Sequence, residues 1–395
     1  MWGHIGEEPH GKQALNADHC GRRQGLFDLG GWMAARRQIE LGLLYSRSGD
    51  YALISQASRA GAVAAIAAVN ADPDLDIRFV PVERDPAGNA DAYGVLCDDI
   101  LRNSGARHVI GCVTSWSRKE VIPVLEKRGG TLWYPLPYEG FEASDHVVYT
   151  HACPNQHLLP LLGWAMPEFG RRAYLTGSNY VWGWEMNRLA RECVTTSGGE
   201  ILGERHLPLG SREVGRIVEE IRHAKPDFIL NNLVGTSTYE FVGAMHRLGS
   251  EAAEFAPDRC PILSCNLTEA EFPALGEAAE GLVAAGPYFR GASGWPGRGP
   301  FASSHEAAAF AAVRELARLL NRQPGAETRG LAALLADDPR GLVDPATHHT
   351  KLPVLIARVE RGAFKIVKAL PAVAGDPYLA RVRPARAHPK LRVVS

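Results

Sequence analysis

From Ile39 onward, short β-like runs alternate with amphipathic helical stretches, and this alternation constrains the fold more than any other feature. Strands separated by helices are typical of βαβ units and of a parallel sheet. One series runs from a strand at 39–45 to a strand at 131–134. A second series runs from a helix at 158–169 to a strand at 228–231. Two series of roughly 110–130 residues predict an α/β fold with two Rossmann-like lobes.

Polar and aromatic residues gather in the loops that follow the predicted strands. Ligands of such sheets bind in the crevice beyond the carboxyl ends of the strands, so these loops are where a site is expected. Serine or threonine at the start of a helix also caps that helix, so each loop alone fits either role. The loops together predict a binding cleft, and they lie at 45–49, 111–119, 133–141, 177–182, 234–238 and 286–289.

Composition and charge argue against several functions. The 395 residues carry 43 Lys and Arg against 44 Asp and Glu, a formal net charge of −1. Proteins that bind nucleic acids draw most of their affinity from cationic side chains that neutralise phosphates, so no direct contact with nucleic acid is expected. The longest small apolar run, 60–69, is about half of what spans a bilayer, so no membrane insertion is expected either.

The familiar catalytic and metal-binding motifs are missing from the sequence. It contains neither a GxxxxGK[ST] phosphate loop nor a GxSxG nucleophile elbow. His305 and Glu306 open like an HExxH zinc motif, but Ala309 stands where the second histidine belongs. We expect that pair on the surface, and His348 and His349 in a polar turn. The sequence therefore predicts no enzyme activity, no metal and no cofactor, and an amide hydrolase is the least favoured alternative.

The termini and the cysteines bear on the compartment. The first 32 residues contain charges and glycines throughout, whereas a secretory signal needs an apolar segment of roughly 7–15 residues. We expect residues 1–38 to be a disordered or non-native extension and residues 380–395 to be a C-terminal tail. The seven cysteines are scattered and form no CxxC pair, which is typical of reduced thiols. These features predict a cytoplasmic protein, with the periplasm as the alternative.

Specific motifs connect the chain to a known family. The segment 111–156 contains the runs YPLPYEG at 134–140 and ACPNQ at 152–156, and it is one of three segments that carry the resemblance. These segments resemble the type I periplasmic-binding-protein superfamily. More narrowly, they resemble the amide-sensing regulator of the aliphatic amidase operon and the urea and short-chain-amide substrate-binding proteins of ABC transporters. The segments are 111–156, 177–187 and 233–241, and the resemblance extends from Ile39 to Leu379.

The resemblance implies two lobes joined by three crossing strands, with a ligand held between them. Lobe one would comprise 39–150 and 282–342, and lobe two 151–281 and 343–379. The loops and the resemblance together give the candidate ligand-binding residues, which are Ser46, Val113, Ser115, Tyr134, Leu136, Pro137, Tyr180, Trp182, Gly235, Thr236 and Tyr288.

Departures from the amide sensor bear on the ligand. Where that sensor has a tyrosine and a threonine, this chain has Val113 and Leu136, and Trp182 stands in place of a second tyrosine. A primary amide needs an apolar box with a few placed polar groups. The substitutions predict a more apolar pocket, suited to an aromatic, branched or nitrile-derived amide. Binding the ammonium group of an amino acid would require an acidic side chain, and none of the candidates is acidic.

The expected function is a non-enzymatic sensor of a small neutral amide. Through an RNA-binding antiterminator as partner, it would regulate an amidase or nitrile hydratase operon. The alternative is the substrate-binding component of an ABC transporter for urea or short-chain amides, with a permease as partner. A homo-oligomer is compatible with either function.

Overall fold

The structure is a computed structural model that describes residues 36–142, 144–295, 299–322, 324–338 and 341–380. The chain divides into two units, Met1–Ala35 and Arg36–Ser395. Most of the predicted N-terminal extension, and the tail from residue 381, lie outside the described residues. Among the described residues, the first strand begins at Arg37, two residues before the predicted start.

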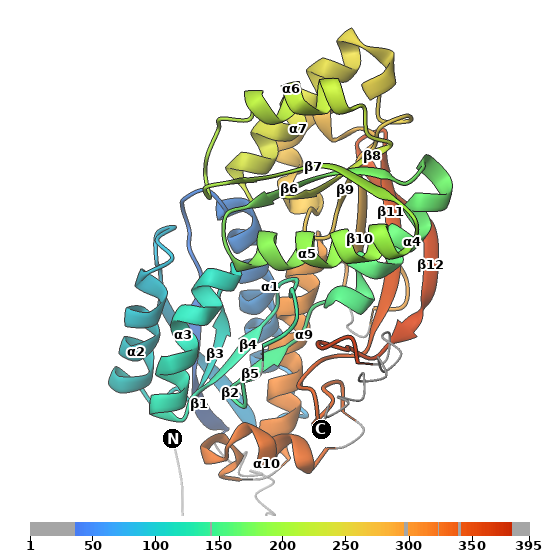
Figure 1. Cartoon of the computed structure of the whole chain (residues 1–395). Helices are drawn as coiled ribbons and strands as arrows, with labels where there is room; N and C mark the ends of the chain where they lie inside the picture. The colour runs from blue at the N-terminus through green and yellow to red at the C-terminus, as the bar shows by residue number, and fades with distance from the viewer. Residues whose placement is uncertain (1–35, 143, 296–298, 323, 339–340, 381–395) are drawn as a thin grey trace, which may run out of the picture. The chain divides into compact units, whose positions relative to one another are not determined.

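The first sheet has five parallel strands in the order β2-β1-β3-β4-β5, the arrangement of a doubly wound fold (Figure 1). Strands β3, β4 and β5 are buried along their whole length, which explains why their sequences are apolar without alternation. The strands are β1 (Arg37–Leu44), β2 (Ile77–Arg84), β3 (His108–Gly111), β4 (Thr131–Tyr134) and β5 (Val147–Tyr149).

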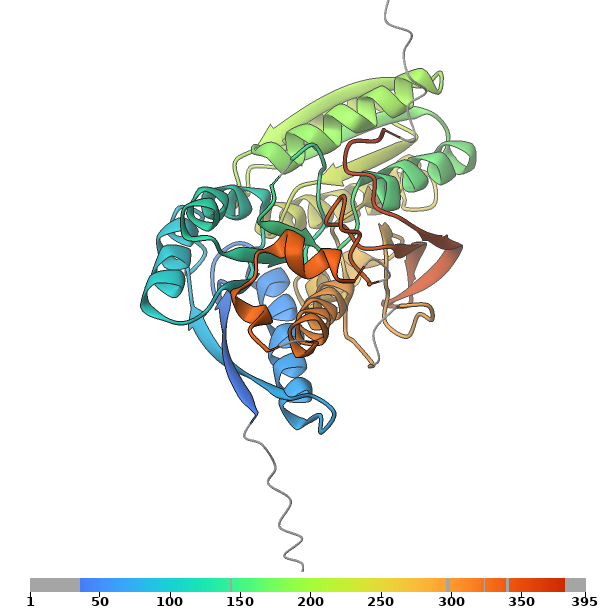
Figure 2. The ribbon, with the colours of Figure 1, turned by 90° about the horizontal axis from the view of Figure 1, so that it is seen from below.

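Helices cover both faces of this sheet. Helix α1 packs along α9, although the two are far apart in the sequence, and α2 packs on α3 (Figure 2). The α1–α9 contact is close because Gly61 of α1 lies against the backbone of Glu306, where a side chain would not fit. The helices are α1 (Ala52–Ala71), α2 (Ala92–Asn103), α3 (Ser115–Arg128), α9 (Ser304–Asn321) and α10 (Leu331–Ala336), with η5 at Ala326–Thr328.

The second sheet has seven strands in the order β12-β11-β10-β9-β8-β6-β7, parallel except at β11 and β12. Its strands are β6 (Arg172–Ser178), β7 (Glu200–Leu207), β8 (Phe228–Asn232), β9 (Ile262–Ser264), β10 (Val283–Gly286), β11 (Leu352–Glu360) and β12 (Ala363–Val373). Its helices are α4 (Leu158–Phe169), α5 (Val181–Thr196), α6 (Gly215–Ala224), α7 (Thr236–Glu251) and α8 (Phe272–Leu275). Short 3-10 turns are η1 (Pro154–Gln156), η2 (Ala253–Phe255), η3 (Glu269–Glu271) and η4 (Gly276–Ala279).

The chain passes between the two sheets three times: after β5, after β10 and before β11. In the residues described, the crossings are irregular, and an isolated parallel bridge joins Tyr149 to His349. The predicted lobe boundary is wrong at strand β10, because residues 283–286 pair with β9 and β11 of the second sheet. The sequence assigned them to lobe one, and no local signal shows which sheet a short apolar strand joins.

The core consists of one large apolar cluster, one smaller cluster and a third, minor cluster around Tyr288 and Phe301. The large cluster fills lobe one and continues through Trp182, Met186 and Leu175 of the second lobe. The smaller cluster lies between the second sheet and α6 and α7. Both lobes therefore contribute to one continuous apolar interior on the side where the two sheets meet.

Helix α1 differs from expectation in its length and apolar character. Among the described residues it alone is long and apolar enough to cross a bilayer by length and composition. Its residues Ile54, Ala62, Ala65, Ile66 and Val69 are buried in the core of lobe one. A core helix of an α/β domain, covered by a sheet and a second helix, has this composition as well.

Candidate ligand-binding cleft

A cavity lies where the carboxyl ends of both sheets meet, and it encloses about 320 Å³ of atom-free space, including the part open to solvent. Loops after β3, β4, β6, β8 and β9 contribute to its lining, as do α1 and the start of α9. The lining residues are Ile54, Val113, Thr114, Ser115, Tyr134, Leu136, Pro137, Tyr180, Trp182, Val234, Asn266 and His305.

Most of the sequence-predicted candidates line this cavity. The structure brings together Val113, Ser115, Tyr134, Leu136, Pro137, Tyr180 and Trp182 from both lobes. Ser46, Gly235, Thr236 and Tyr288 lie outside the lining. The lining also contains five residues that were not among the candidates: Ile54, Thr114, Val234, Asn266 and His305.

The loop after β3 places Ser115 at the cleft. The chain turns sharply at Gly111 and Cys112, and Cys112 adopts a left-handed φ of 61°. Thr114 then caps α3 by accepting a hydrogen bond from the backbone N–H of Ser117 at 3.1 Å. Ser115 is thereby fixed as the first residue of the helix, facing the cavity rather than acting as the cap.

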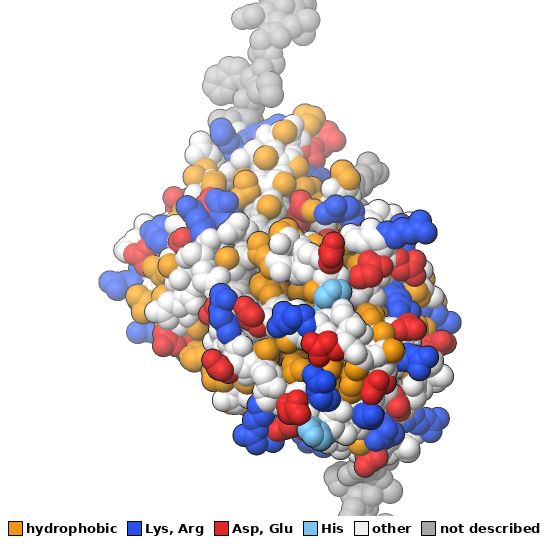
Figure 3. All heavy atoms as spheres, turned by 90° about the horizontal axis from the view of Figure 1, so that it is seen from above, with side chains coloured by type: hydrophobic (Ala, Val, Ile, Leu, Met, Phe, Trp, Pro, Cys, Tyr) orange, Lys and Arg blue, Asp and Glu red, His pale blue; other side chains and the backbone are white. Residues whose placement is uncertain are grey.

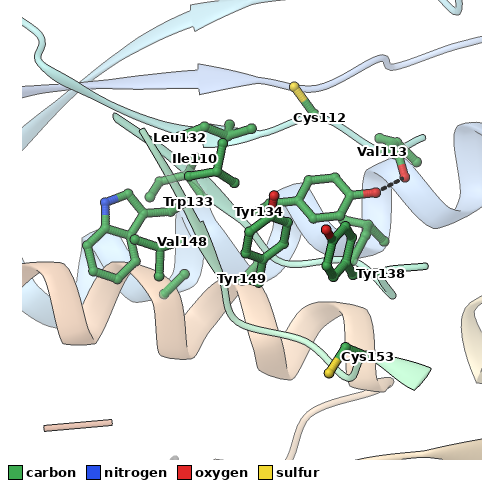
Figure 4. Packing of buried hydrophobic residues seen from close by; sticks show 14 of the residues in the cluster. Ile110, Cys112, Val113, Leu132, Trp133, Tyr134, Tyr138, Val148, Tyr149 and Cys153 are labelled. Carbon is green, nitrogen blue, oxygen red and sulfur yellow. Dashed lines mark hydrogen bonds between the residues drawn. The ribbon is translucent and has the colours of Figure 1, made fainter. Parts of the chain in front are cut away.

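The hydroxyls of Ser115 and Tyr134, two of the three on the lobe-one wall, donate their protons to protein acceptors. Ser115 Oγ donates to a carboxylate oxygen of Glu139 at 2.7 Å. Tyr134 Oη donates to the carbonyl oxygen of Val113 at 3.1 Å, as Figure 4 shows. A hydroxyl has one proton and two lone pairs, so both oxygens present acceptors to a ligand.

A buried charged cluster lies behind this wall. Arg118 is fully buried and donates to Glu139 at 2.6 Å and to Glu142 at 2.7 Å. Its guanidinium also lies 4.9 Å from the ring centroid of Tyr134 and 4.8 Å from that of Tyr138. This cluster was not predicted from the sequence, although Arg118 lies at helical spacing from the buried Val121 and Leu125.

Electrostatics stabilise the charged form of Glu142. Burial raises the pKa of this carboxyl, but the neighbouring Arg118 and Lys119 outweigh burial and lower the pKa to about 2. Lys119 Nζ lies 2.7 Å from Glu142, and Tyr149 Oη donates to it at 2.8 Å. The buried carboxylate of Glu139 and the largely buried carboxylate of Glu142 are thus balanced by one buried guanidinium and one half-exposed ammonium group.

The lobe-two wall contributes an indole N–H. Trp182 is 3% exposed, and its Nε1 has no hydrogen-bond partner among the described residues. The residue sits in the first turn of α5, which approaches β6 so closely that Gly183 lies against the backbone of Ser178. A buried N–H without a partner is costly, and a ligand acceptor would satisfy it.

His305 is buried, so the expectation that His305 and Glu306 form a surface pair is wrong. The side chain is fully buried, lines the cavity and has no partner for Nε2 among the described residues. Burial lowers the pKa of His305 to about 3, so the ring is neutral at pH 7. The helix explains the burial, because Ala309 and Leu316 lie on the same buried face of α9.

The second histidine pair also departs from a simple polar turn. His349 is buried and stacks on Tyr149 at a centroid distance of 4.4 Å, at the crossing between the lobes. Burial lowers its pKa to about 4. His348 precedes it with a left-handed φ of 58°. Of the pair, only His349 contributes to the packing of the core.

The four candidates outside the cavity have other contacts. Ser46 Oγ lies 2.9 Å from Tyr93 Oη in the core of lobe one. Gly235 and Thr236 contact the other lobe, where the N–H of Thr236 donates to the carbonyl of Asp50 at 3.0 Å. Tyr288 donates to the carbonyl of Phe301 at 3.0 Å in a separate small cluster.

Charged side chains of both signs are mixed on the surface (Figure 3). Lys and Arg side chains lie beside Asp and Glu on the face shown in Figure 3. Such an ion pair joins α6 to α7 between Arg222 and Glu251, and the pairs Arg212–Glu240 and Lys225–Glu254 lie near the ends of these helices. Among the residues that the structure describes, no group of three His, Cys, Asp or Glu could hold a metal ion.

Comparisons with known proteins agree with this architecture. The chain is similar to a solute-binding protein of an ABC transporter from Rhodopseudomonas palustris HaA2 in complex with p-hydroxybenzoic acid. The TM-score is 0.74 at 19% identity, over 88% of this chain and 100% of that chain. A solute-binding protein from R. palustris in complex with benzoate has a TM-score of 0.73 at 18% identity, over 86% and 98% of the two chains.

The branched-chain amino acid transporter substrate-binding protein LivJ from Streptococcus pneumoniae, in complex with isoleucine, gives a TM-score of 0.68 at 15% identity, over 86% and 100%. At these identities the likeness concerns the fold, and it confirms the predicted α/β fold of two lobes. The model of the periplasmic binding protein domain family matches residues 39–303, more than half of the chain. The chain therefore belongs to the periplasmic-binding-protein family.

Proposed function

We propose that the protein captures a small neutral solute between its lobes and delivers it to the permease of an ABC transporter. Family membership and the transporter origin of the structural relatives support this role over that of a regulator. The periplasm is the proposed compartment, because such proteins pass their solute to a membrane permease.

The ligand class rests on one observation, the hydrogen-bonding polarity of a cavity whose lining has no charged side chain. Ser115 and Tyr134 offer acceptors on one wall, Trp182 offers a donor on the other, and the neutral ring of His305 adds an Nε2 without a partner among the described residues. A primary amide has two N–H donors and one carbonyl acceptor, so it complements both walls. A carboxylate has acceptors only, and it would face the two hydroxyl oxygens with its charge unpaired.

The apolar part of the lining indicates a ligand larger than acetamide. Val113 and Leu136 bring aliphatic surface to the cavity, and Ile54 and Val234 add to it from both lobes. A four-heavy-atom amide is limited to a dissociation constant of tens of micromolar, at about −1.5 kcal/mol per atom. An aromatic or branched amide buries more apolar surface and is the proposed substrate class.

Isothermal titration with matched amides and acids tests this proposal. We expect benzamide and isobutyramide to bind more tightly than acetamide or urea. We expect benzoate to bind at least about a hundredfold more weakly than benzamide, because burying an unpaired carboxylate costs several kcal/mol. Tighter binding of benzoate than of benzamide would overturn the ligand class. Uptake of labelled benzamide by cells with and without the gene tests delivery to a permease.

One observation favours the regulator as a second candidate. The described cysteines, which are Cys97, Cys112, Cys153, Cys193, Cys260 and Cys265, are all free thiols, and most of them are buried. Scattered free thiols are typical of a reducing compartment. A cytoplasmic sensor would use the same amide cleft to act on an RNA-binding antiterminator. Ligand-dependent co-purification with such a partner, instead of amide uptake, would support this candidate.

A further inference from the structure

We propose that Glu139 determines ligand selectivity although it does not contact the ligand. Its carboxylate accepts the hydrogen bond from the hydroxyl of Ser115, so that the lobe-one wall of the cleft binds only ligands that donate an N–H. The inference rests on the proposed function and names a positioning residue for the same site. Glu139 itself does not line the cavity.

Both oxygens of the Glu139 carboxylate have fixed partners. Oε1 accepts from Arg118 Nη2 at 2.6 Å, and Oε2 accepts from Ser115 Oγ at 2.7 Å. The residue is 1% exposed, and Arg118 is fully buried. The charged pair therefore fixes the orientation of the carboxylate, and Oε2 stays directed at Ser115.

The Ser115 proton prefers this carboxylate to a neutral ligand. A hydrogen bond from a hydroxyl to an ionised oxygen is roughly twice as strong as one between neutral groups. Rotating the hydroxyl toward the cavity would leave a buried carboxylate oxygen without its donor. Ser115 thus presents lone pairs to the ligand, and Tyr134, whose proton goes to the carbonyl of Val113, presents lone pairs beside it.

The wild-type protein is therefore expected to distinguish an amide from its methyl ketone. Benzamide and acetophenone have nearly the same shape and the same carbonyl, but acetophenone has a methyl group in place of the amino group. Leaving the acceptors of Ser115 and Tyr134 unpaired is expected to weaken acetophenone binding by at least about tenfold relative to benzamide.

Glu139→Gln tests the role of the carboxylate. Its amide carbonyl can accept from Arg118, and its amino group then donates to Ser115 Oγ, which frees the hydroxyl proton for the ligand. By titration calorimetry, the ratio of acetophenone to benzamide dissociation constants should fall to within about threefold, since the wall now also donates. Glu139→Asp keeps the charge, but its shorter side chain no longer reaches Ser115, so it should also lower the ratio of acetophenone to benzamide dissociation constants. This variant replaces Glu139→Gln in the test if the Gln variant does not fold.

Glu142→Gln is the matched control. It removes an equal charge from the same arginine, 2.7 Å from Arg118 Nε, but Glu142 has no hydrogen bond with Ser115 among those described. The control should keep the wild-type ratio, even if its thermal stability falls as much as that of Glu139→Gln. An unchanged ratio in Glu139→Gln, or an equal loss in Glu142→Gln, would overturn the role of Glu139 alone. A wild-type protein that binds no amide would overturn the proposed ligand class together with it.

Discussion

Replacing Trp182 by phenylalanine separates ligand binding from stability, because its indole N–H has no partner among the described residues. A buried unsatisfied donor costs about 1–3 kcal/mol in the ligand-free protein. The smaller ring forfeits packing of roughly 1–2 kcal/mol, less than the ~3–5 kcal/mol of a truncation to alanine. The two effects oppose each other, so the free energy of unfolding should change by between a loss of about 1 kcal/mol and a gain of about 2 kcal/mol.

Ligand affinity should respond differently to this substitution. If the Trp182 N–H donates to a ligand carbonyl, its loss removes about 0.5–1.5 kcal/mol of net hydrogen-bond energy. With the lost contact of the larger ring, the dissociation constant of benzamide should rise by about tenfold or more. Chemical denaturation of the ligand-free protein and titration calorimetry measure the two quantities separately.

Trp133→Phe is the matched control, because this indole is fully buried and donates to His108 Nδ1 at 3.4 Å, outside the cavity lining. Here the free energy of unfolding should fall by about 2–4 kcal/mol, from lost packing and an unpaired imidazole nitrogen, while benzamide affinity stays unchanged. The reasoning about Trp182 is refuted if its substitution destabilises the ligand-free protein as strongly as the control and leaves benzamide affinity intact.

Two further predictions concern lobe closure and acid stability. In Gly235→Ala, the new Cβ would overlap the carbonyl oxygen of Asp50 on the opposite lobe. This variant should bind benzamide at least about tenfold more weakly than the wild-type protein. Gly243→Ala in the following helix is the control and should bind benzamide with wild-type affinity. An equal affinity in the two variants would contradict the closure contact. Burial lowers the pKa values of His157 and His305 to about 3, so the unfolded chain takes up protons first as the pH falls below about 6.5. Unfolding free energy by urea denaturation should fall by about 2 kcal/mol per histidine between pH 7 and pH 5, and a flat profile would contradict their burial as neutral rings.

The alternation of strands and helices could be predicted from the sequence because it is a local pattern. The predicted strand at 131–134 and the helix at 158–169 match β4 and α4. The lobe membership of β10 could not be predicted, because it depends on pairing with β11, about 70 residues away along the chain.

The apolar side of the cleft was easier to anticipate than its polar support. Val113 lies in the loop after β3 and Trp182 in the first turn of the helix after β6, so their position at the cleft follows from topology. The Ser115–Glu139 contact joins residues 24 positions apart, on different elements, and no local rule pairs them. The available signal was Arg118 on α3, which shares a helical face with the buried Val121 and Leu125.

His305 shows the same limitation more sharply. A histidine next to a glutamate at the start of a helix is usually exposed, which is why the pair was expected on the surface. The apolar residues one and two turns later, Ala309 and Ala312, were the contrary signal, since an unbroken stripe of small residues is typical of a close helix contact. Side chains recruited by the packing of α9 on α1 could not be placed without that contact.

A crystal structure with benzamide bound tests the central claim most directly. The account predicts the ligand in the cavity between the lobes, with its carbonyl oxygen within hydrogen-bond distance of Trp182 Nε1 and its amino group directed at Ser115 Oγ. A ligand bound elsewhere, or turned so that its carbonyl oxygen meets Ser115, would contradict the assignment of donor and acceptor walls.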